Sequence, residues 1–337
     1  MSRASLDQTF VAASDWVRRH VEAGRFPAAV LGVTDARGTL HVEAFGQVHG
    51  RATTIDDRFA LYSVTKPLTA LTAMRAVERG YLTVDARLQD ALPGFLSRDV
   101  TVAHLMSHTS GLIDYALGQP YPHGATTLHE LVERSGLETV VGTARRYNNL
   151  AWAGVSAVLE AAVGAPFEQQ FAELAAAVGA DSLSFDTDDV ADVHGGPVMQ
   201  HDPIAMFRER HPAAGAAARV DDLLAVGRSL LAGDGAIVAP STLESMLRPR
   251  TEGLFIIDPE PRKRFEQFGL GFNLPRRPGL IDHSVFGHEG WCMSQFWVSP
   301  ASGLALVLLT NRLDAREPFE PVRPDELQNA VFSRSAQ

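Results

Sequence analysis

The chain reads Phe-Ala-Leu-Tyr-Ser-Val-Thr-Lys-Pro from Phe59 to Pro67, a stretch in which a lysine follows a serine by three positions. Of the 30 basic side chains among 337 residues, two are lysines, Lys66 and Lys263, and the rest are arginines. Arginine keeps its proton inside proteins, whereas burial can lower the pKa of a lysine towards neutrality. A neutral amine beside a serine hydroxyl is a general base beside a nucleophile, so Ser63 and Lys66 are candidate catalytic residues.

Apolar residues at helical spacing predict a helix that begins near Ser63 and ends at Gly80. Ser63 then lies at the helix N-terminus, with Pro67 near the first turn, where proline costs least. Residues three apart share a helix face, which brings Ser63 and Lys66 within hydrogen-bond reach. Free N–H groups at a helix N-terminus favour a developing oxyanion. The alternative is that Ser63 only caps the helix and that Lys66 is a solvated surface residue.

Two later segments carry further candidate residues. Arg146-Tyr147-Asn148-Asn149 stands before a predicted helix over residues 150–163. The sequence Phe-Gly-His-Glu-Gly-Trp occupies residues 286–291, just before a predicted hairpin over residues 295–310. Taken separately, Asn149 would be a helix cap, Tyr147 a packing residue, and residues 286–291 a glycine-flanked turn.

In this order, the three segments resemble the motifs of the serine β-lactamase and penicillin-binding-protein-like superfamily, closest to class C β-lactamases and their esterase relatives. The family patterns Ser-x-x-Lys, Tyr-x-Asn and His-x-Gly correspond to Ser63–Lys66, Tyr147–Asn149 and His288–Gly290. Residues 105–112, Leu-Met-Ser-His-Thr-Ser-Gly-Leu, are similar to a further family signature that looks like a structural turn. The resemblance covers roughly residues 5 to 315.

The resemblance implies an α/β fold of the β-lactamase-like type, in which helices flank a mostly antiparallel sheet and a helical domain lies beside it. Hairpins predicted over residues 28–45 and 295–310 agree with a sheet built from both ends of the chain. Helices are also predicted over Leu6–Glu22 and from Pro324 onward. We expect a discontinuous sheet domain of residues 1–66 and 254–337, a helical domain of residues 67–253, and an active site in the cleft between them.

The resemblance also implies a role for each site residue. Ser63 would attack a carbonyl and form an acyl-enzyme, Lys66 would accept its proton, and Tyr147 would assist and later protonate the leaving group. Whether Lys66 or Tyr147 is the actual base stays open, and Asn149 would hydrogen-bond Lys66 or the substrate. The backbone N–H groups of Ser63 and Trp291 would form the oxyanion hole. The remaining predicted substrate-binding residues are Tyr62, His288, Glu289 and Gly290.

The third motif departs from that of β-lactamases and carboxypeptidases, which place a lysine and a threonine there to hold a substrate carboxylate. Here these positions carry His288 and Glu289. Histidine is only partly charged at neutral pH, and a carboxylate that faced the cleft would repel an anionic substrate. The alternative is that strand alternation points Glu289 away from the cleft.

We therefore predict a serine hydrolase that forms an acyl-serine intermediate on neutral small substrates, namely esters, thioesters or amides. Among these, we favour a carboxylic ester hydrolase. The alternatives are an acyltransferase or amidase with the same acyl-enzyme, a β-lactamase or D-alanyl carboxypeptidase, and a non-catalytic binding module on the same fold.

Composition limits the partners that we expect. A formal net charge of −10 gives no basic footprint for nucleic acid, and no apolar run approaches the roughly 20 residues needed to span a membrane. Residues 1–10 lack a secretory-signal pattern, which favours the cytoplasm. Cys292 is the only cysteine, so no intramolecular disulfide is expected. We expect neither a metal nor another cofactor, and the sequence leaves the oligomeric state open.

Overall fold

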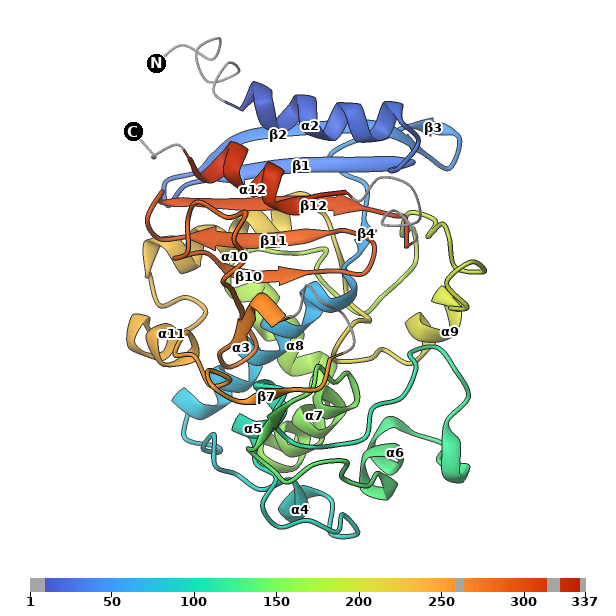
Figure 1. The fold of residues 1–337 in the computed structure, drawn as a ribbon, viewed down its shortest axis with the longest axis vertical. Coiled ribbons are helices and arrows are strands. Elements are labelled where there is room, and N and C mark those ends of the chain that lie inside the picture. The colour runs from blue at the N-terminus through green and yellow to red at the C-terminus, as the bar shows by residue number, and fades with distance from the viewer. Residues whose placement is uncertain (1–9, 259–263, 314–321, 334–337) are drawn as a thin grey trace.

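An eight-stranded sheet crosses the upper half of the molecule (Figure 1). The computed structural model describes residues 10–258, 264–313 and 322–333. The strand order is β3-β2-β1-β12-β11-β10-β9-β8, and neighbouring strands pair antiparallel. The strands are β1 (Ala28–Thr34), β2 (Thr39–Val48), β3 (Arg51–Ala52), β8 (Glu266–Phe268), β9 (Asn273–Pro275), β10 (Phe286–Glu289), β11 (Gln295–Ser299) and β12 (Leu304–Thr310). This sheet confirms the predicted fold class and both predicted hairpins.

The two ends of the chain meet in the middle of this sheet, where β1 pairs with β12 and Leu31 lies opposite Leu308. Strands β1–β3 come from the first part of the chain and β8–β12 from the last, as expected for a sheet built from both ends. One helix of the middle segment, α10 (Val220–Ala232), also packs on the sheet. The division of the chain into two domains at residues 66 and 254 stays a prediction.

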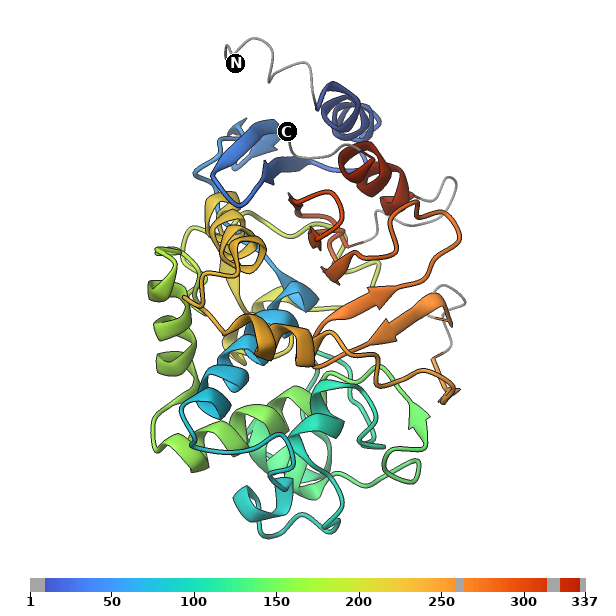
Figure 2. The same ribbon diagram turned by 90° about the vertical axis from the view of Figure 1, so that its left-hand side faces the viewer.

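Helices cover both faces of the sheet (Figure 2). Helices α2 (Val11–Glu22) and α12 (Pro324–Phe332) share one apolar core with Leu31 and the other side chains on that face of β1. Side chains on the opposite face, such as Val30, belong to the core that includes α10. A Cβ atom at Gly32 would lie 2.6 Å from Val220 Cγ2, so glycine allows α10 to lie close against β1. Successive side chains of β1 therefore pack into two separate cores, one on each face of the sheet. The predicted residues 6–9 of the first helix lie outside the described part of the chain.

Most of the chain between β3 and β8 forms the lower half of the molecule (Figure 1). Its helices are α3 (Thr65–Glu78), α4 (Leu88–Ala91), α5 (Val102–Met106), α6 (Leu128–Arg134), α7 (Leu150–Val163), α8 (Phe167–Ala177), α9 (Pro203–Arg208) and α11 (Pro240–Met246), with 3-10 turns η1 (Tyr62–Val64) and η2 (Pro122–Gly124). Short strand pairs join β4 (Phe59–Ala60) to β6 (Ala217–Ala218) and β5 (Ala144–Arg145) to β7 (Phe255–Ile256). The helix predicted from Ser63 is therefore a 3-10 turn followed by α3.

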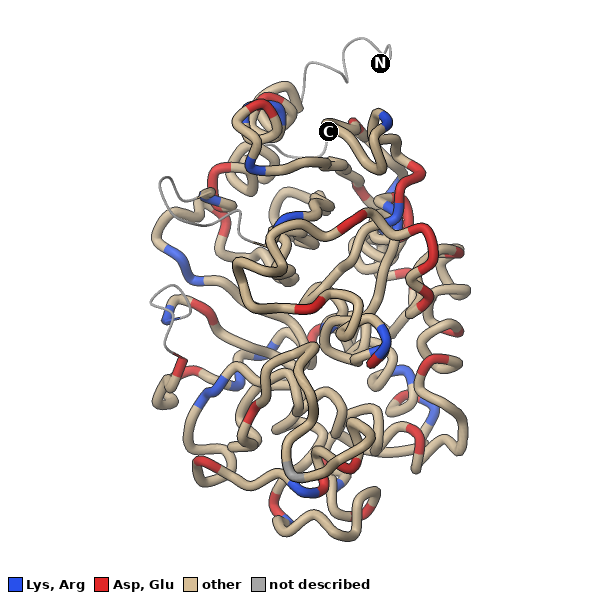
Figure 3. Tube along the Cα trace, turned by 90° about the vertical axis from the view of Figure 1, so that its right-hand side faces the viewer, with Lys and Arg blue, Asp and Glu red and all other residues tan. Residues whose placement is uncertain are grey.

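Basic and acidic residues are interspersed along the chain (Figure 3), and several of them form surface ion pairs such as Arg79 with Glu173. No single helix in the described ranges is long and apolar enough to cross a membrane. Helices α7 and α8, which meet at a bend of 88°, satisfy the length and composition criteria only when they are taken together.

Candidate active site

The expected nucleophile and base lie next to each other at the start of α3. Tyr62 has a left-handed backbone with φ of 46°, which turns the chain sharply before Ser63. Such a conformation costs about 1–3 kcal/mol outside glycine and is held by the surrounding structure. Lys66 is fully buried, and its Nζ donates to Ser63 Oγ at 2.9 Å. The same ammonium donates to Asn149 Oδ1 at 2.9 Å and to the Ala213 carbonyl at 3.2 Å, so three acceptors fix its position.

Tyr147, in the segment between β5 and α7, approaches the same serine. Its hydroxyl donates to Ser63 Oγ at 2.8 Å, and its ring stacks on His108 with 4.5 Å between ring centroids. Lys66 Nζ lies 4.8 Å from the centroid of the Tyr147 ring. Burial raises the pKa of the Tyr147 phenol well above its ordinary value, and the nearby Glu266, Asp114 and Asp258 carboxylates raise it further. The phenol is therefore protonated at neutral pH and acts as a hydrogen-bond donor to Ser63.

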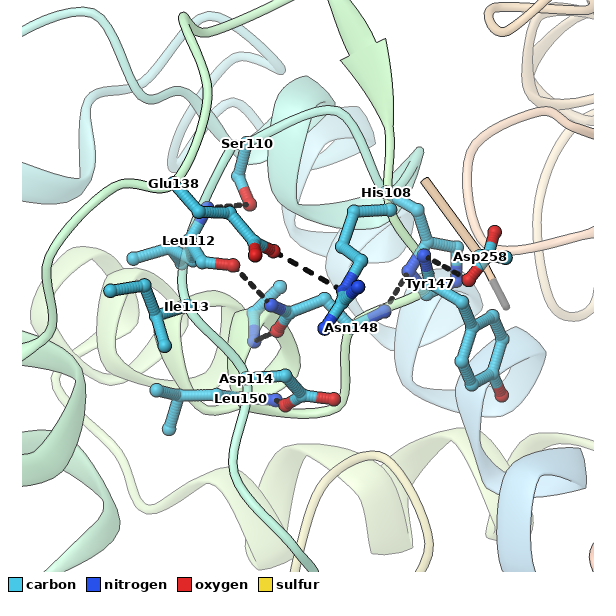
Figure 4. A network of polar contacts seen from close by, with 12 residues as sticks. His108, Ser110, Leu112, Ile113, Asp114, Glu138, Tyr147, Asn148, Leu150 and Asp258 are labelled. Atoms are coloured by element: carbon cyan, nitrogen blue, oxygen red, sulfur yellow. Dashed lines mark hydrogen bonds and ion pairs between the residues drawn. The ribbon is translucent and has the colours of Figure 1, made fainter. Parts of the chain in front are cut away.

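Asn149 is oriented by a carboxylate that the sequence argument missed. Asp114 accepts a hydrogen bond from the backbone N–H of Asn149 at 3.0 Å. It also accepts from the backbone N–H of Leu150, which lies beside it in Figure 4, at 2.9 Å. It also accepts from Asn149 Nδ2 at 3.2 Å, which leaves Oδ1 facing Lys66. The side chain that caps α7 is Asn148, whose Oδ1 accepts from the Ala151 N–H at 2.7 Å. The Asn149 side chain therefore does not cap α7, and it contacts Lys66 instead.

Burial raises the pKa of the Asp114 carboxyl, whereas its backbone hydrogen bonds and the Lys66 charge act in the opposite direction. Asp114 is separated from Asn149 by 35 positions in the sequence. No motif or periodic pattern in the surrounding sequence distinguished Asp114.

The end of β10 lies directly against the segment that leads into Ser63. A Cβ atom at Gly290 would lie 2.5 Å from the Leu61 carbonyl oxygen, so only glycine permits this approach. Trp291 follows, and its ring lies 6.1 Å from that of Tyr62 in an edge-on arrangement. His288 is buried in the strand, with its ring 6.0 Å from the Tyr147 ring. The structure therefore brings residues of all three sequence motifs to Ser63.

Glu289 lines the cavity over Ser63, and its carboxylate forms an ion pair. Its Oε1 accepts from Arg277 Nη1 at 2.8 Å, and the Arg277 guanidinium also lies 2.8 Å from Asp325 on α12. Glu289 pairs with Gln295 across the strands, and Gln295 is hydrogen-bonded to Gln328 of α12. Glu289 therefore points its carboxylate towards α12, where Arg277 offsets its charge. A Glu289 carboxylate that repels an anionic substrate was one expectation from the sequence. Because Arg277 is paired with this carboxylate, its charge is compensated.

A cavity of about 410 Å³ opens over Ser63. It is lined by the predicted residues Tyr62, Ser63, Tyr147, Asn149, His288, Glu289, Gly290 and Trp291, and by others that include Asp114, Arg146, His201, Asp258, Glu266 and Asn273. Asp258 accepts from the Tyr147 backbone N–H at 3.1 Å and pairs with the buried Arg145 at 3.3 Å. Within the described ranges, no three His, Cys, Asp or Glu side chains are grouped so that they could hold a metal ion.

Comparisons with known proteins show the family of this chain. The family model described as Beta-lactamase matches residues 13–329. Esterase EstB of Burkholderia gladioli is 28% identical over 342 aligned positions, which cover 85% of this chain and 84% of that protein. Penicillin-binding protein 4 of Amycolatopsis lactamdurans is 42% identical over 95 residues, which are 26% of this chain and 25% of that protein.

The fold has close structural counterparts as well. The solved structure of EstCE1, described as a hydrolase with promiscuous acyltransferase activity, matches with a TM-score of 0.76 at 22% identity. The match covers 98% of this chain and 99% of that one. The resemblance inferred from the three motifs is confirmed, and the chain belongs to the β-lactamase family of serine hydrolases.

Proposed function

We propose that this protein is a carboxylic ester hydrolase that acts through an acyl intermediate on Ser63. The observation that carries the proposal is the pair of hydrogen bonds at the serine hydroxyl, from Lys66 Nζ at 2.9 Å and from Tyr147 at 2.8 Å. A nucleophile held between an amine and a phenol has both a proton acceptor and a proton donor within reach. The similarity to esterase EstB, which extends over most of both chains, supports the same class of reaction.

In the proposed reaction, Lys66 first releases its proton to solvent, and the neutral amine then accepts the Ser63 proton as the oxygen attacks the ester carbonyl. The backbone N–H groups of Ser63 and Trp291 stabilise the oxyanion, and Tyr147 donates its proton to the departing alcohol. Lys66 then returns a proton to Tyr147, whose ring lies beside it. Water replaces the alcohol in the second half of the reaction and releases the acid. Asp114 acts as a positioning residue, because it holds Asn149 against Lys66.

Neutral substrates are favoured by the charges around the cavity. Among the described residues that line it, Arg146 is the one arginine or lysine, and its Nε lies 3.2 Å from Glu138. Acidic side chains are more frequent in the lining, where Asp114, Asp258 and Glu266 accompany Glu289, whose carboxylate is paired with Arg277. A histidine, His288, stands where penicillin-recognising relatives carry a lysine. A substrate carboxylate would therefore meet few cationic partners in this cavity.

Labelling of Ser63 tests this proposal. Exposure to a fluorophosphonate, followed by intact-protein mass measurement, should give one adduct that Ser63→Ala abolishes. Wild-type protein should also hydrolyse p-nitrophenyl acetate and butyrate, and do so faster than it opens a chromogenic cephalosporin. Absence of both adduct and turnover would overturn the enzymatic proposal in favour of a binding module. Faster turnover of the cephalosporin would favour a β-lactamase.

Acyl transfer is a second candidate, because the acyl-enzyme is the same and EstCE1 is described as having acyltransferase activity. Adding an alcohol to the p-nitrophenyl butyrate assay separates the two outcomes. An acyltransferase would give the alkyl butyrate as the main product, whereas a hydrolase would give butyrate.

A further inference from the structure

A second group of aromatic side chains lies beside Ser63, apart from the rings that surround Tyr147. The His201 ring is 4.7 Å from the Trp291 ring and 5.8 Å from the Tyr62 ring. These three residues line the catalytic cavity together with Leu117 and Met199. His201 comes from the loop before α9, far from the other two in sequence, and it is 94% buried (6% exposed). No local pattern in the sequence indicated this contact.

Hydrogen bonds hold the His201 ring in one orientation. Its Nδ1 lies 3.1 Å from the Leu117 carbonyl oxygen, and its Nε2 lies 3.3 Å from the Tyr62 hydroxyl. A carbonyl oxygen only accepts, so Nδ1 carries the proton and Nε2 accepts from Tyr62. Burial lowers the pKa of His201, which keeps the ring neutral at neutral pH. His201 thus connects the loop that contains Leu117 to the residue that precedes the nucleophile.

The loop around His201 is packed tightly against the loop around Gly118. A Cβ atom at Gly118, which has φ of 72°, would lie 2.7 Å from the Asp202 carbonyl oxygen. Gln119 Nε2 donates to the Gln200 carbonyl at 3.1 Å, and the His201 N–H donates to the Gly196 carbonyl at 2.9 Å. The imidazole is therefore part of a fixed wall of the cavity.

The position of Tyr147 indicates which half of the substrate meets this wall. The residue that protonates the leaving alcohol must lie beside that alcohol. Tyr147 packs with His108, Phe268 and His288, so the alcohol belongs on that side of Ser63. The acyl chain then extends in the other direction, towards Tyr62, His201 and Trp291.

We propose that His201 is a specificity-determining residue that closes the acyl subsite and restricts the enzyme to short, apolar acyl chains. This inference rests on the proposed ester hydrolase function and adds the substrate class to it. The end of a short chain would contact the His201 ring, and a longer chain would collide with it. The neutral ring offers a mainly apolar surface, since both of its nitrogens are engaged by Leu117 and Tyr62.

The test compares kcat/KM of wild type and His201→Ala across p-nitrophenyl esters from acetate to decanoate. Alanine removes the five ring atoms, which makes room for about three methylenes. Each newly buried methylene should raise kcat/KM about fourfold, so the ratio of octanoate to acetate activity should rise by roughly 60-fold. His201→Asn keeps a donor and an acceptor in a smaller side chain and should shift the optimum less. His49→Ala, at an exposed histidine paired with Asp192, is the matched control and should keep the wild-type profile.

A second series keeps the acetyl group and lengthens the alcohol, and His201→Ala should leave its profile unchanged. Rates of labelling by alkyl fluorophosphonates of increasing length give the same comparison without turnover. An unchanged acyl profile in active His201→Ala and His201→Asn, or a shift in the alcohol series instead, would overturn the inference. Failure of wild-type Ser63 to be labelled would overturn the proposed function itself, which is a distinguishable result.

Discussion

Replacement of Tyr147 by phenylalanine removes the hydroxyl that lies 2.8 Å from Ser63 Oγ and keeps the ring. The stacking on His108, at 4.5 Å between centroids, and the contact with Phe268, at 6.1 Å, should both survive. The change therefore isolates one proton donor in an otherwise intact site. Because burial holds the pKa of this phenol well above its ordinary value, its expected role is to donate a proton to the leaving group.

The expected loss of activity depends on the leaving group. Ethoxide is a poor leaving group that needs a proton, so Tyr147→Phe should lower kcat/KM for ethyl butyrate by about 100- to 10,000-fold. The p-nitrophenolate anion leaves without a proton. For p-nitrophenyl butyrate the variant loses one hydrogen bond at Ser63, worth about 1.4 kcal/mol, and the rate should fall by about tenfold.

The assay measures kcat/KM for both esters, which share one acyl group and report the acylation step. Tyr115→Phe is the matched control, because Tyr115 lines the same cavity but donates to Glu209 at 2.9 Å rather than to Ser63. Thermal unfolding of each variant shows whether the fold is preserved. Equal losses on both esters would refute the leaving-group role and would assign Tyr147 to the attack of Ser63. A full rate on ethyl butyrate would exclude Tyr147 as the acid.

Three further changes test other parts of the site. Lys66→Arg should lower kcat/KM for p-nitrophenyl acetate by about 100- to 10,000-fold, because a guanidinium keeps its proton; a rate near that of wild type would contradict Lys66 as the base. The amide of Asp114→Asn cannot accept hydrogen bonds from all the N–H groups that the carboxylate binds. Urea unfolding should therefore give a free energy of unfolding that is lower by about 2 kcal/mol. The kcat should also fall, because Asn149 is held less firmly. An equally stable and active variant would show that Asp114 does not position Asn149. Burial and the Lys66 charge lower the pKa of His211 from its ordinary value of 6.5 to about 3. Between these pH values the imidazole is therefore protonated in the unfolded chain and neutral in the folded one. The contribution of neutral His211 to the free energy of unfolding is fully present above pH 6.5. It decreases by up to about 5 kcal/mol as the pH falls towards 3. His211→Gln should flatten this part of the unfolding free energy profile, and an unchanged slope would contradict the assignment.

Features that depend on neighbouring residues could be predicted from the sequence. Ser63 and Lys66 are three positions apart at the start of a helix, and helical geometry alone brings them into contact. The two hairpins follow from short, mostly apolar runs separated by turn residues, and they were confirmed in the sheet. The order of the three motifs was sufficient to indicate the family, which the match over residues 13–329 confirmed. The catalytic roles of the motif residues stay predictions.

Features that depend on distant segments were decided only by the tertiary structure. Asp114 reaches Asn149 across 35 positions, and His201 reaches Tyr62 across 139, so no periodic pattern connects either pair. The direction of Glu289 depends on which face of β10 packs against α12, where Arg277 is already bound to Asp325. Sequence periodicity shows that adjacent strand residues point to opposite faces, but it does not show which face holds the active site. Sequence alone therefore determined the contact between Ser63 and Lys66 and the family, because these depend on local geometry and motif order. Only the packing of the sheet against the helices decided the charge and shape of the cavity, because these arise from side chains that folding brings together.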